Sequence, residues 1–321
     1  MRVLVTGRGS IAQRHARHLR DAVPGVVLGV LSQSTELGGL APCERFGSLE
    51  QALHWQPDAV IVASVSARHA DELSAILGCN LPCLVEKPLV VSTQQLEAVR
   101  RAAARAQNLR SVVVGCNLRY LGSLQHVARE LQGGGLGRLV RAQFEAGQNL
   151  AHWRPGRDLA SGYSAHAGQG GGVLFDLVHE VDMARLLLGP LEVVASVNAR
   201  LSSLPIDSDD VHVALLRTAA GAPVTISLDY VAQQATRRYA MVCERGTLHW
   251  DLIARRAWVE EQAGTRLLCN DPADFDVGAT YGAEMRDWLQ AIHDPAHVVQ
   301  SPLEAALETA ALMLAMKRGG A

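Results

Sequence analysis

The sequence contains very little lysine. Only Lys87 and Lys317 are lysines among its 30 basic residues, and all the others are arginine. Because arginine keeps its proton at any accessible pH, a lysine in this composition indicates a role that requires a proton to be lost near neutrality. Lys87 ends the hydrophobic stretch 84–88, Leu-Val-Glu-Lys-Pro, and is therefore a candidate acid–base residue. The alternative is an ordinary lysine at a strand edge with its ammonium group in water.

The sequence also lacks a strong net charge, long apolar runs and paired cysteine motifs. The formal charge of -2, with both signs mixed along the chain, argues against nucleic acid or an anionic membrane as partner and favours a small molecule. Neither a secretory signal nor a membrane span is recognisable, so we expect a cytoplasmic protein. The six cysteines lack the spacing of a zinc or redox pair, and we expect no metal centre.

Strands alternate with helices over the first third of the 321 residues. Each short apolar run is followed by a helical pattern, which is typical of a doubly wound parallel sheet of the Rossmann kind. In such a sheet all strand carboxyl ends lie on one edge, where a ligand can bind. The expected strands are 2–6, 26–31, 59–63, 83–86 and 112–115.

From about residue 120 strands dominate and follow one another through short turns, which predicts a large, mainly antiparallel open sheet in an α+β domain. We expect a Rossmann domain at 1–119, a substrate-binding and oligomerisation domain at 120–300, and a C-terminal helix and tail at 301–321 that pack back near the Rossmann domain. Expected strands are 139–148, 191–201, 211–218, 223–230, 238–243, 247–251 and 256–260, and expected helices are 122–132, 173–188, 281–293 and 303–317.

The first strand leads into Gly7-x-Gly9-x-x-Ala12 and then into a helix. Backbone amides at such a helix start bind the pyrophosphate of a dinucleotide, although a tight structural turn would give the same motif. The second strand ends at Ser32 and Gln33 without the carboxylate that would repel a 2'-phosphate, so we expect NAD(P), with NADP slightly favoured. Arg8 and Arg14 could supply a counter-charge. Predicted contacts at this turn are Gly7, Arg8, Gly9, Ser10, Ile11 and Ala12.

A third motif follows the glycines at 170–172. Asp176 and His179 are three residues apart in a predicted helix, so the carboxylate could hold one imidazole nitrogen while the other faces a substrate. A structural pair at a domain interface is the alternative. Glu180 does not complete a zinc-protease motif, because Met183 occupies the place of the second histidine.

The polar segment 149–169 is a predicted substrate loop. Its arginines, including Arg154, could bind a carboxylate or phosphate, and Trp153 or Tyr163 could stack on a sugar. These side chains could equally serve only to close the loop over the sheet. A large open sheet with an apolar face also requires cover, so we expect a homodimer or homotetramer.

Taken together, the motifs resemble those of the Gfo/Idh/MocA oxidoreductases, named for glucose-fructose oxidoreductase and inositol dehydrogenase. The similarity covers almost the whole chain: the opening Gly-x-Gly, the Glu86-Lys87-Pro88 tripeptide, Asn117-x-Arg119-Tyr120, the Asp/His helix, and 301–305 before the last helix. It implies that Lys87 orients or protonates the substrate oxygen, while His179, held by Asp176, takes the proton as hydride leaves.

The resemblance also implies further contacts. The cofactor would touch Ser32, Gln33, Ser64, Val65, His69, Glu86, Lys87 and Asn117, and the substrate Lys87, Arg119, Trp153, Arg154, Tyr163, Asp176 and His179. Without the resemblance, His69 would be interpreted as an ordinary histidine at a helix start. Only two residues separate Asp176 from His179, where the commoner family pattern has three, so the general base could be His179 or Lys87. The shorter spacing resembles a branch associated with surface-polysaccharide and nonulosonic-acid synthesis.

Two functions follow from these observations. The first is a cytoplasmic NAD(P)-dependent dehydrogenase or reductase acting on a hydroxyl or keto group of a sugar, cyclitol or sugar derivative. The second is a non-catalytic NAD(P)-binding regulatory or sensor protein of the same fold. The set of Lys87, Asp176 and His179 favours the enzyme.

Overall fold

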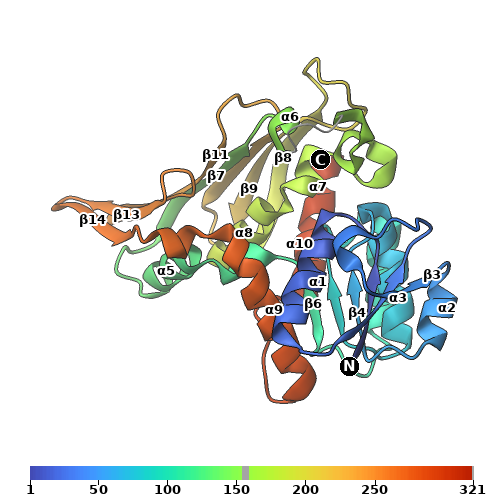
Figure 1. The fold of residues 1–321 in the computed structure, drawn as a ribbon. Helices are drawn as coiled ribbons and strands as arrows, with labels where there is room; N and C mark the ends of the chain where they lie inside the picture. The colour runs from blue at the N-terminus through green and yellow to red at the C-terminus, as the bar shows by residue number, and fades with distance from the viewer. Residues whose placement is uncertain (154–158, 320–321) are drawn as a thin grey trace. The chain divides into compact units, whose positions relative to one another are not determined.

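The computed structural model describes residues 1–153 and 159–319. Its residue contacts divide the chain into two compact units, and each unit is built from two segments. The first unit comprises Met1–Asn117 and Gly278–Ala310. The second comprises Leu118–Val277 together with the segment from Ala311 onward. Both units are drawn in Figure 1.

The first unit contains a parallel sheet of six strands in the order β3-β2-β1-β4-β5-β6. Nearly every residue of its central strands is buried, as expected for parallel strands covered by helices on both faces. The predicted Rossmann sheet is confirmed, with one extra edge strand, β3, that the sequence analysis did not predict. The strands are β1 Arg2–Thr6, β2 Val27–Leu31, β3 Glu44–Phe46, β4 Ala59–Val62, β5 Cys83–Val85 and β6 Val112–Val114.

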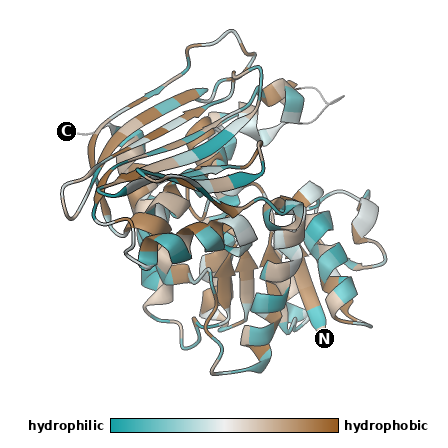
Figure 2. Cartoon of the chain, turned by 90° about the vertical axis from the view of Figure 1, so that its left-hand side faces the viewer, coloured by the Kyte–Doolittle hydropathy of each residue, from teal (hydrophilic) through white to brown (hydrophobic). Residues whose placement is uncertain are grey.

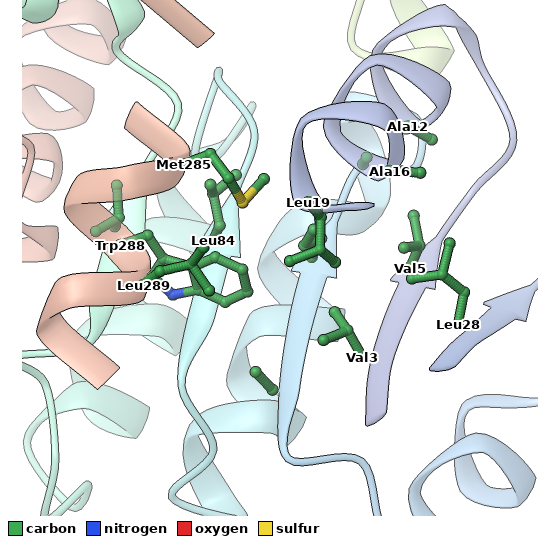
Figure 3. Packing of buried hydrophobic residues seen from close by; sticks show 14 of the residues in the cluster. Val3, Val5, Ala12, Ala16, Leu19, Leu28, Leu84, Met285, Trp288 and Leu289 are labelled. Carbon is green, nitrogen blue, oxygen red and sulfur yellow. The ribbon is translucent and has the colours of Figure 1, made fainter. Parts of the chain in front are cut away.

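Helices of the first unit pack their apolar sides on this sheet. Figure 3 shows Leu19 of one helix and Met285, Trp288 and Leu289 of another in one cluster with strand residues such as Leu84. Trp288 is fully buried, and its indole N–H donates to the Ser111 carbonyl at 3.1 Å. The helices are α1 Ser10–Ala22, α2 Leu49–His54, α3 His69–Gly78, α4 Thr93–Ala103, α9 Val277–His293 and α10 Leu303–Arg318, of which α9 and α10 cross between the two units along the chain.

The second unit contains an eight-stranded sheet in the order β14-β13-β12-β11-β7-β10-β9-β8. All neighbours are antiparallel except β7 and β10, so the predicted mainly antiparallel sheet is confirmed. The edge strand β14 was not predicted. The strands are β7 Leu139–Gly147, β8 Leu191–Ala199, β9 Val211–Thr218, β10 Pro223–Asp229, β11 Thr236–Cys243, β12 Gly246–Asp251, β13 Arg256–Glu261 and β14 Gly264–Cys269.

Helices lie on one face of this second sheet, and apolar residues are exposed on the other. Strand β9 alternates strictly between the two faces, with Ala214 and Leu216 buried and Val213 and Leu215 exposed. Figure 2 shows both apolar (brown) and polar (teal) segments along the strands of this sheet. The helices are α5 Gly122–Gln132, α6 Leu150–Trp153, α7 Val173–Asp176 and α8 Val178–Leu188.

The helix predicted at 173–188 is divided in two. Leu177 leaves helical geometry, with φ of -98° and ψ of 30°, and separates α7 from α8. Short 3-10 turns complete the fold. These are η1 Gly38–Leu40, η2 Ser66–Arg68, η3 Asn117–Tyr120, η4 Leu159–Ser161, η5 Tyr163–Ala165, η6 Ala167–Gln169 and η7 Pro272–Phe275. Within the described ranges, no helix is long and apolar enough to cross a bilayer.

Candidate functional site

The glycine turn after β1 has the shape that a dinucleotide requires. Gly7 has a φ of 83°, and a Cβ built there would lie 2.6 Å from the Ala63 carbonyl oxygen, so a side chain is excluded on two grounds. A Cβ built at Gly9 would meet nothing within 4 Å among the described residues. The space in front of Gly9 is thus open, and the backbone itself faces it.

The start of α1 is suited to a negatively charged group. Gly9 is its N-cap and offers no side chain to the first amides, and the first turn, residues 10–13, contains no acid. Unpaired amides and the helix dipole favour an anion at this position. The predicted turn contacts Ser10, Ile11 and Ala12 all belong to this first turn, and the residues present fit the pyrophosphate of a dinucleotide.

Residues at the end of β2 lie among basic side chains. The Ser32 carbonyl accepts from Arg45 at 3.4 Å, and Arg8 donates to the Glu36 carbonyl at 3.4 Å. Gln33 turns its amide to the Gly47 carbonyl at 2.6 Å. Arg14, which the sequence analysis paired with Arg8, instead places its guanidinium 4.4 Å from the centre of the Tyr281 ring.

Lys87 follows a buried carboxylate at the end of β5. Glu86 lies 2.7 Å from His15 through Oε1, and its Oε2 accepts the Lys87 amide at 3.2 Å. Burial alone would raise the pKa of Glu86, but the hydrogen bond with His15 and the charges of His15 and Lys87 outweigh it and lower the pKa. Glu86 is therefore an anion beside Lys87 at neutral pH.

His69 joins two of the loops at this edge. Its ring nitrogens lie 2.8 Å from the Pro88 carbonyl and 3.1 Å from the Ser64 carbonyl, so it connects the loops after β5 and β4. Val65, which follows Ser64 in the loop after β4, is 39% exposed. Asn117, after β6, is buried and donates to the Thr280 hydroxyl at 2.7 Å. All the residues predicted to bind cofactor thus follow a strand at one edge of the sheet.

The second unit has a pocket of about 240 Å³ that contains two of the predicted catalytic residues. Asp176 and His179 both line it, although a helix break separates them. Trp153 lines it too, and its indole N–H has no hydrogen-bond partner among the described residues. The remaining lining residues are Ala146, Gly147, Gln148, Leu177, Ala235, Thr236, Arg237, Leu252 and Ile253.

Two tyrosines fix the carboxylate of Asp176. Tyr230 donates to Oδ2 at 2.6 Å and Tyr163 donates to Oδ1 at 2.8 Å. Burial, followed by the charge of Asp176, raises the pKa of Tyr230 well above its ordinary value, so its hydroxyl stays protonated and donates. Trp153 packs edge-on against Tyr230, with ring centres 5.4 Å apart. Tyr163 was predicted to stack on a sugar, and its hydroxyl bond to Asp176 was not foreseen.

Two further ion pairs of the second unit hold charged groups that are buried or partly buried. Arg119, predicted to bind substrate, grips Asp182 in a bidentate pair at 2.8 and 2.6 Å, and both side chains are buried. Glu180 accepts from Arg237 at 2.7 and 3.1 Å and from the Tyr239 hydroxyl at 3.2 Å. The sequence analysis missed these partners, because they lie on strands and helices far along the chain.

One further predicted site residue and the second lysine complete the comparison. Arg154 lies outside the described residues. Lys317, the second lysine, lies in α10, where its ammonium group is 2.8 Å from the buried carboxylate of Asp209 and 4.6 Å from the centre of the Phe175 ring.

Known proteins resemble the chain over nearly its full length. Inositol 2-dehydrogenase of Mycolicibacterium gilvum is 27% identical over 315 residues, which cover 93% of this chain and 84% of that protein. The WlbA dehydrogenase from Bordetella pertussis, solved with NADH and UDP-GlcNAcA, shares the fold with a TM-score of 0.83 at 20% identity, covering 99% and 94% of the two chains. A myo-inositol dehydrogenase from Corynebacterium glutamicum gives 0.76 at 20% identity, covering 100% and 96%.

Family models match both units. The oxidoreductase family with an NAD-binding Rossmann fold matches residues 1–115, and the GFO/IDH/MocA C-terminal domain matches residues 124–249. The two matches together span most of the chain. The first contains the glycine turn, and the second contains Asp176 and His179. The chain therefore belongs to the Gfo/Idh/MocA family of oxidoreductases and is an enzyme with an NAD-binding Rossmann domain.

Proposed function

We propose that this protein is a cytoplasmic NAD(P)-dependent dehydrogenase or reductase acting on a hydroxyl or keto carbon of a sugar, cyclitol or sugar derivative. The observation that carries the proposal is the pocket in which Asp176, His179 and Trp153 lie together. It combines titratable groups with an aromatic surface and an indole donor, which is the composition needed to hold a polyhydroxylated ring. The six cysteines are free thiols, as expected in a reducing compartment.

The residues named divide the acid–base work. When bound, the nicotinamide supplies the hydride acceptor or donor. His179 takes the hydroxyl proton during oxidation and returns it during reduction, and Asp176, fixed by Tyr163 and Tyr230, keeps that proton transfer oriented. Lys87, beside the anionic Glu86, orients or protonates the substrate oxygen.

The names of similar proteins define the substrates to be tried. Inositol appears in the name of the Mycolicibacterium relative, and UDP-GlcNAcA is bound in the Bordetella structure. We propose that the substrate is of one of these two kinds, a free cyclitol or a nucleotide-linked sugar. The second kind would place the enzyme in surface-polysaccharide or nonulosonic-acid metabolism.

The cofactor is proposed to be NAD(P), with NADP slightly favoured. Arg8 and Arg45 both donate to backbone carbonyls around the end of β2, where the adenosine ribose of a bound dinucleotide lies in this fold. A 2'-phosphate would draw the two guanidinium groups from these long 3.4 Å contacts. Arg45→Gln should then lower kcat/KM for NADPH by about tenfold and leave that for NADH within twofold, whereas equal losses would remove the preference.

We also propose a homodimer or homotetramer formed through the open sheet of the second unit. Three exposed apolar side chains, Val197, Val213 and Leu215, are neighbours on its uncovered face, since Val197 pairs with Val213 across β8 and β9. A contiguous apolar surface of this kind is typical of subunit interfaces.

The experiment that tests the function uses two changes at Lys87. With inositols and UDP-sugars as substrates, Lys87→Met and Lys87→Arg should each lower kcat by at least about 100-fold and leave the dissociation constant of NAD(P)H within about threefold. Lys87→Arg keeps the charge but cannot exchange its proton near neutrality, so it isolates the acid–base role. Near-normal turnover by Lys87→Arg would overturn this role, and NAD(P)H binding without any hydride exchange would overturn the proposed reaction.

A further inference from the structure

A second group of chemically reactive side chains lies in the second unit and contributes nothing to the pocket of Asp176. It consists of His126 on α5, Cys269 at the end of β14 and Asp274 in the turn η7. One ligand atom from each residue lies within 4.8 Å of the other two. Imidazole nitrogen, thiolate sulfur and carboxylate oxygen are the three donor types that zinc takes in proteins.

One of the donor–donor distances already matches the requirements of a tetrahedral ion. Ligand bonds of 2.0–2.3 Å place neighbouring donor atoms roughly 3.3–3.8 Å apart. His126 Nε2 and Asp274 Oδ2 are already 3.4 Å apart, and the thiol of Cys269 needs to move by only about 1 Å to complete the triangle. Water reaches the site, since the side chains of His126 and Asp274 are 38% and 30% exposed while Cys269 is buried beneath them.

We propose that His126, Cys269 and Asp274 bind one divalent transition-metal ion, zinc above all, with water in the fourth position. A thiolate together with an imidazole selects Zn²⁺ or Co²⁺ over Mg²⁺ and Ca²⁺, which prefer oxygen ligands. Because the three ligands come from a helix, a strand end and a turn, the ion pins α5 to the edge of the large sheet. The ion is structural and does not take part in the proposed hydride transfer.

Neighbouring groups act on two of the three ligands. Burial and, after it, the charge of Asp274 raise the pKa of Cys269 to about 11, while Arg129 acts in the opposite direction. Arg129 also donates to His126 Nδ1 at 3.1 Å, and this contact has to open so that Nδ1 can carry the proton while Nε2 binds the ion.

Packing around the cluster already keeps its three elements close. Arg266 on β14 forms an ion pair with Glu130 on α5 at 2.6 Å. A Cβ built at Gly122, the first residue of α5, would collide with the Asp274 side chain, so glycine at this position permits the close approach of η7. The ligands thus need little backbone movement to close on an ion.

Metal binding is tested directly on the full chain, after dialysis against a chelator and in the presence of a phosphine reductant. Cobalt is the spectroscopic probe, since a thiolate bound to Co²⁺ gives an intense near-ultraviolet charge-transfer band. The exposed thiol at Cys79 is removed in every protein by Cys79→Ser. The expected result is one equivalent of Co²⁺ per chain, displaced by Zn²⁺, and a higher thermal midpoint with Zn²⁺ than with equal Mg²⁺.

Variants identify the ligands. Cys269→Ser and His126→Gln should each weaken Co²⁺ binding by at least about 100-fold and abolish the Zn²⁺-dependent gain in thermal midpoint. Cys243→Ser removes an equally buried thiol on β11 and should leave both readouts as in the parent. Should Cys269→Ser fail to fold, His126→Gln decides, because its side chain is partly exposed and dispensable for packing.

A charge-transfer band of equal strength in the parent and in either ligand variant would overturn the proposal, as would a Zn²⁺ stabilisation equal to that with Mg²⁺. Both readouts are independent of turnover. The metal site and the proposed oxidoreductase function can therefore fail separately.

Discussion

At the scale of single residues, the best-defined feature of the pocket is the carboxylate of Asp176 between two tyrosine hydroxyls. A hydrogen bond to a charged group contributes about 1.5–3 kcal/mol. Tyr230→Phe should therefore lower kcat/KM by about 10- to 100-fold through a less well held Asp176. The check is steady-state kinetics alongside the thermal midpoint of each variant.

The matched control for this change is Tyr239→Phe. Tyr239 is equally buried and also donates to a carboxylate, but to that of Glu180, which does not line the pocket as Asp176 does. We expect this variant to lose stability and keep kcat/KM within about threefold of the parent. Equal kinetic losses in the two variants would show that Tyr230 acts only through packing.

A second residue, Glu284, makes stability depend on pH. It is fully buried in the first unit, and its carboxylate oxygens have no hydrogen-bond partner within the described chain. Burial, followed by the charges of Glu86 and Asp287, raises the pKa of Glu284 well above its ordinary 4.5. Because the folded-state pKa is the higher one, stability is fully present below pH 4.5 and declines as the pH rises toward the folded-state value.

Glu284→Gln removes this dependence. At pH 8 the variant should be more stable than the parent by on the order of 1–3 kcal/mol, and the difference should shrink as the pH falls toward 4.5. Denaturant unfolding from pH 5 to 8 measures it. Glu304→Gln, at an exposed site, serves as control and should show no such trend. A constant difference across this range would contradict a protonated Glu284.

Local sequence was enough to predict some of the candidate site residues. The glycine turn, Lys87 and the Asp176–His179 spacing carry their own chemical signals, because each is a short motif beside a recognisable strand or helix. Tyr230 has no such signal, since it lies 54 residues from its partner Asp176. Likewise, the sequence predicted that Arg119 binds substrate, because its ion-pair partner Asp182 lies 63 residues away in the chain.

At the scale of secondary structure, α9 contributes three buried side chains, Met285, Trp288 and Leu289, to the core of the first unit. Its Trp288 fills the cluster drawn in Figure 3 and is fully buried. Trp288→Ala should cost about 3–5 kcal/mol in unfolding free energy through the cavity and the lost bond to Ser111. Val298→Ala, at a side chain that is 83% exposed, should change it by less than about 0.5 kcal/mol. Calorimetry with both variants checks the contrast.

Most helices and strands were predicted within a few residues, and the exceptions have physical reasons. β3 has three residues and β14 has mostly exposed ones, so neither shows a buried or alternating pattern. The interruption at Leu177 has no signal in the sequence, because α7 and residues 178–184 of α8 are all buried. Buried helices lack the periodicity that marks boundaries.

At the scale of the whole molecule, the uncovered face of the large sheet predicts self-association. Val213→Asp with Leu215→Asp places two charges in the exposed apolar patch formed with Val197. The wild type should be a dimer or tetramer at micromolar concentration and the double variant a monomer, because an uncompensated charge in a desolvated interface is costly. Light scattering after size exclusion measures the masses. Val298→Asp is the control, and a monomeric wild type would refute the prediction.

The division of the first unit between two distant segments has a consequence during synthesis. Its six strands are complete once residue 114 has been made, but α9 is added only after the second unit's segment, Leu118–Val277. At 5–20 residues per second, a ribosome takes roughly 10–40 s to advance from residue 114 to residue 310. Throughout that interval the nascent parallel sheet lacks the Trp288 helix on one side, so the nucleotide-binding unit cannot finish folding when its own strands have been made.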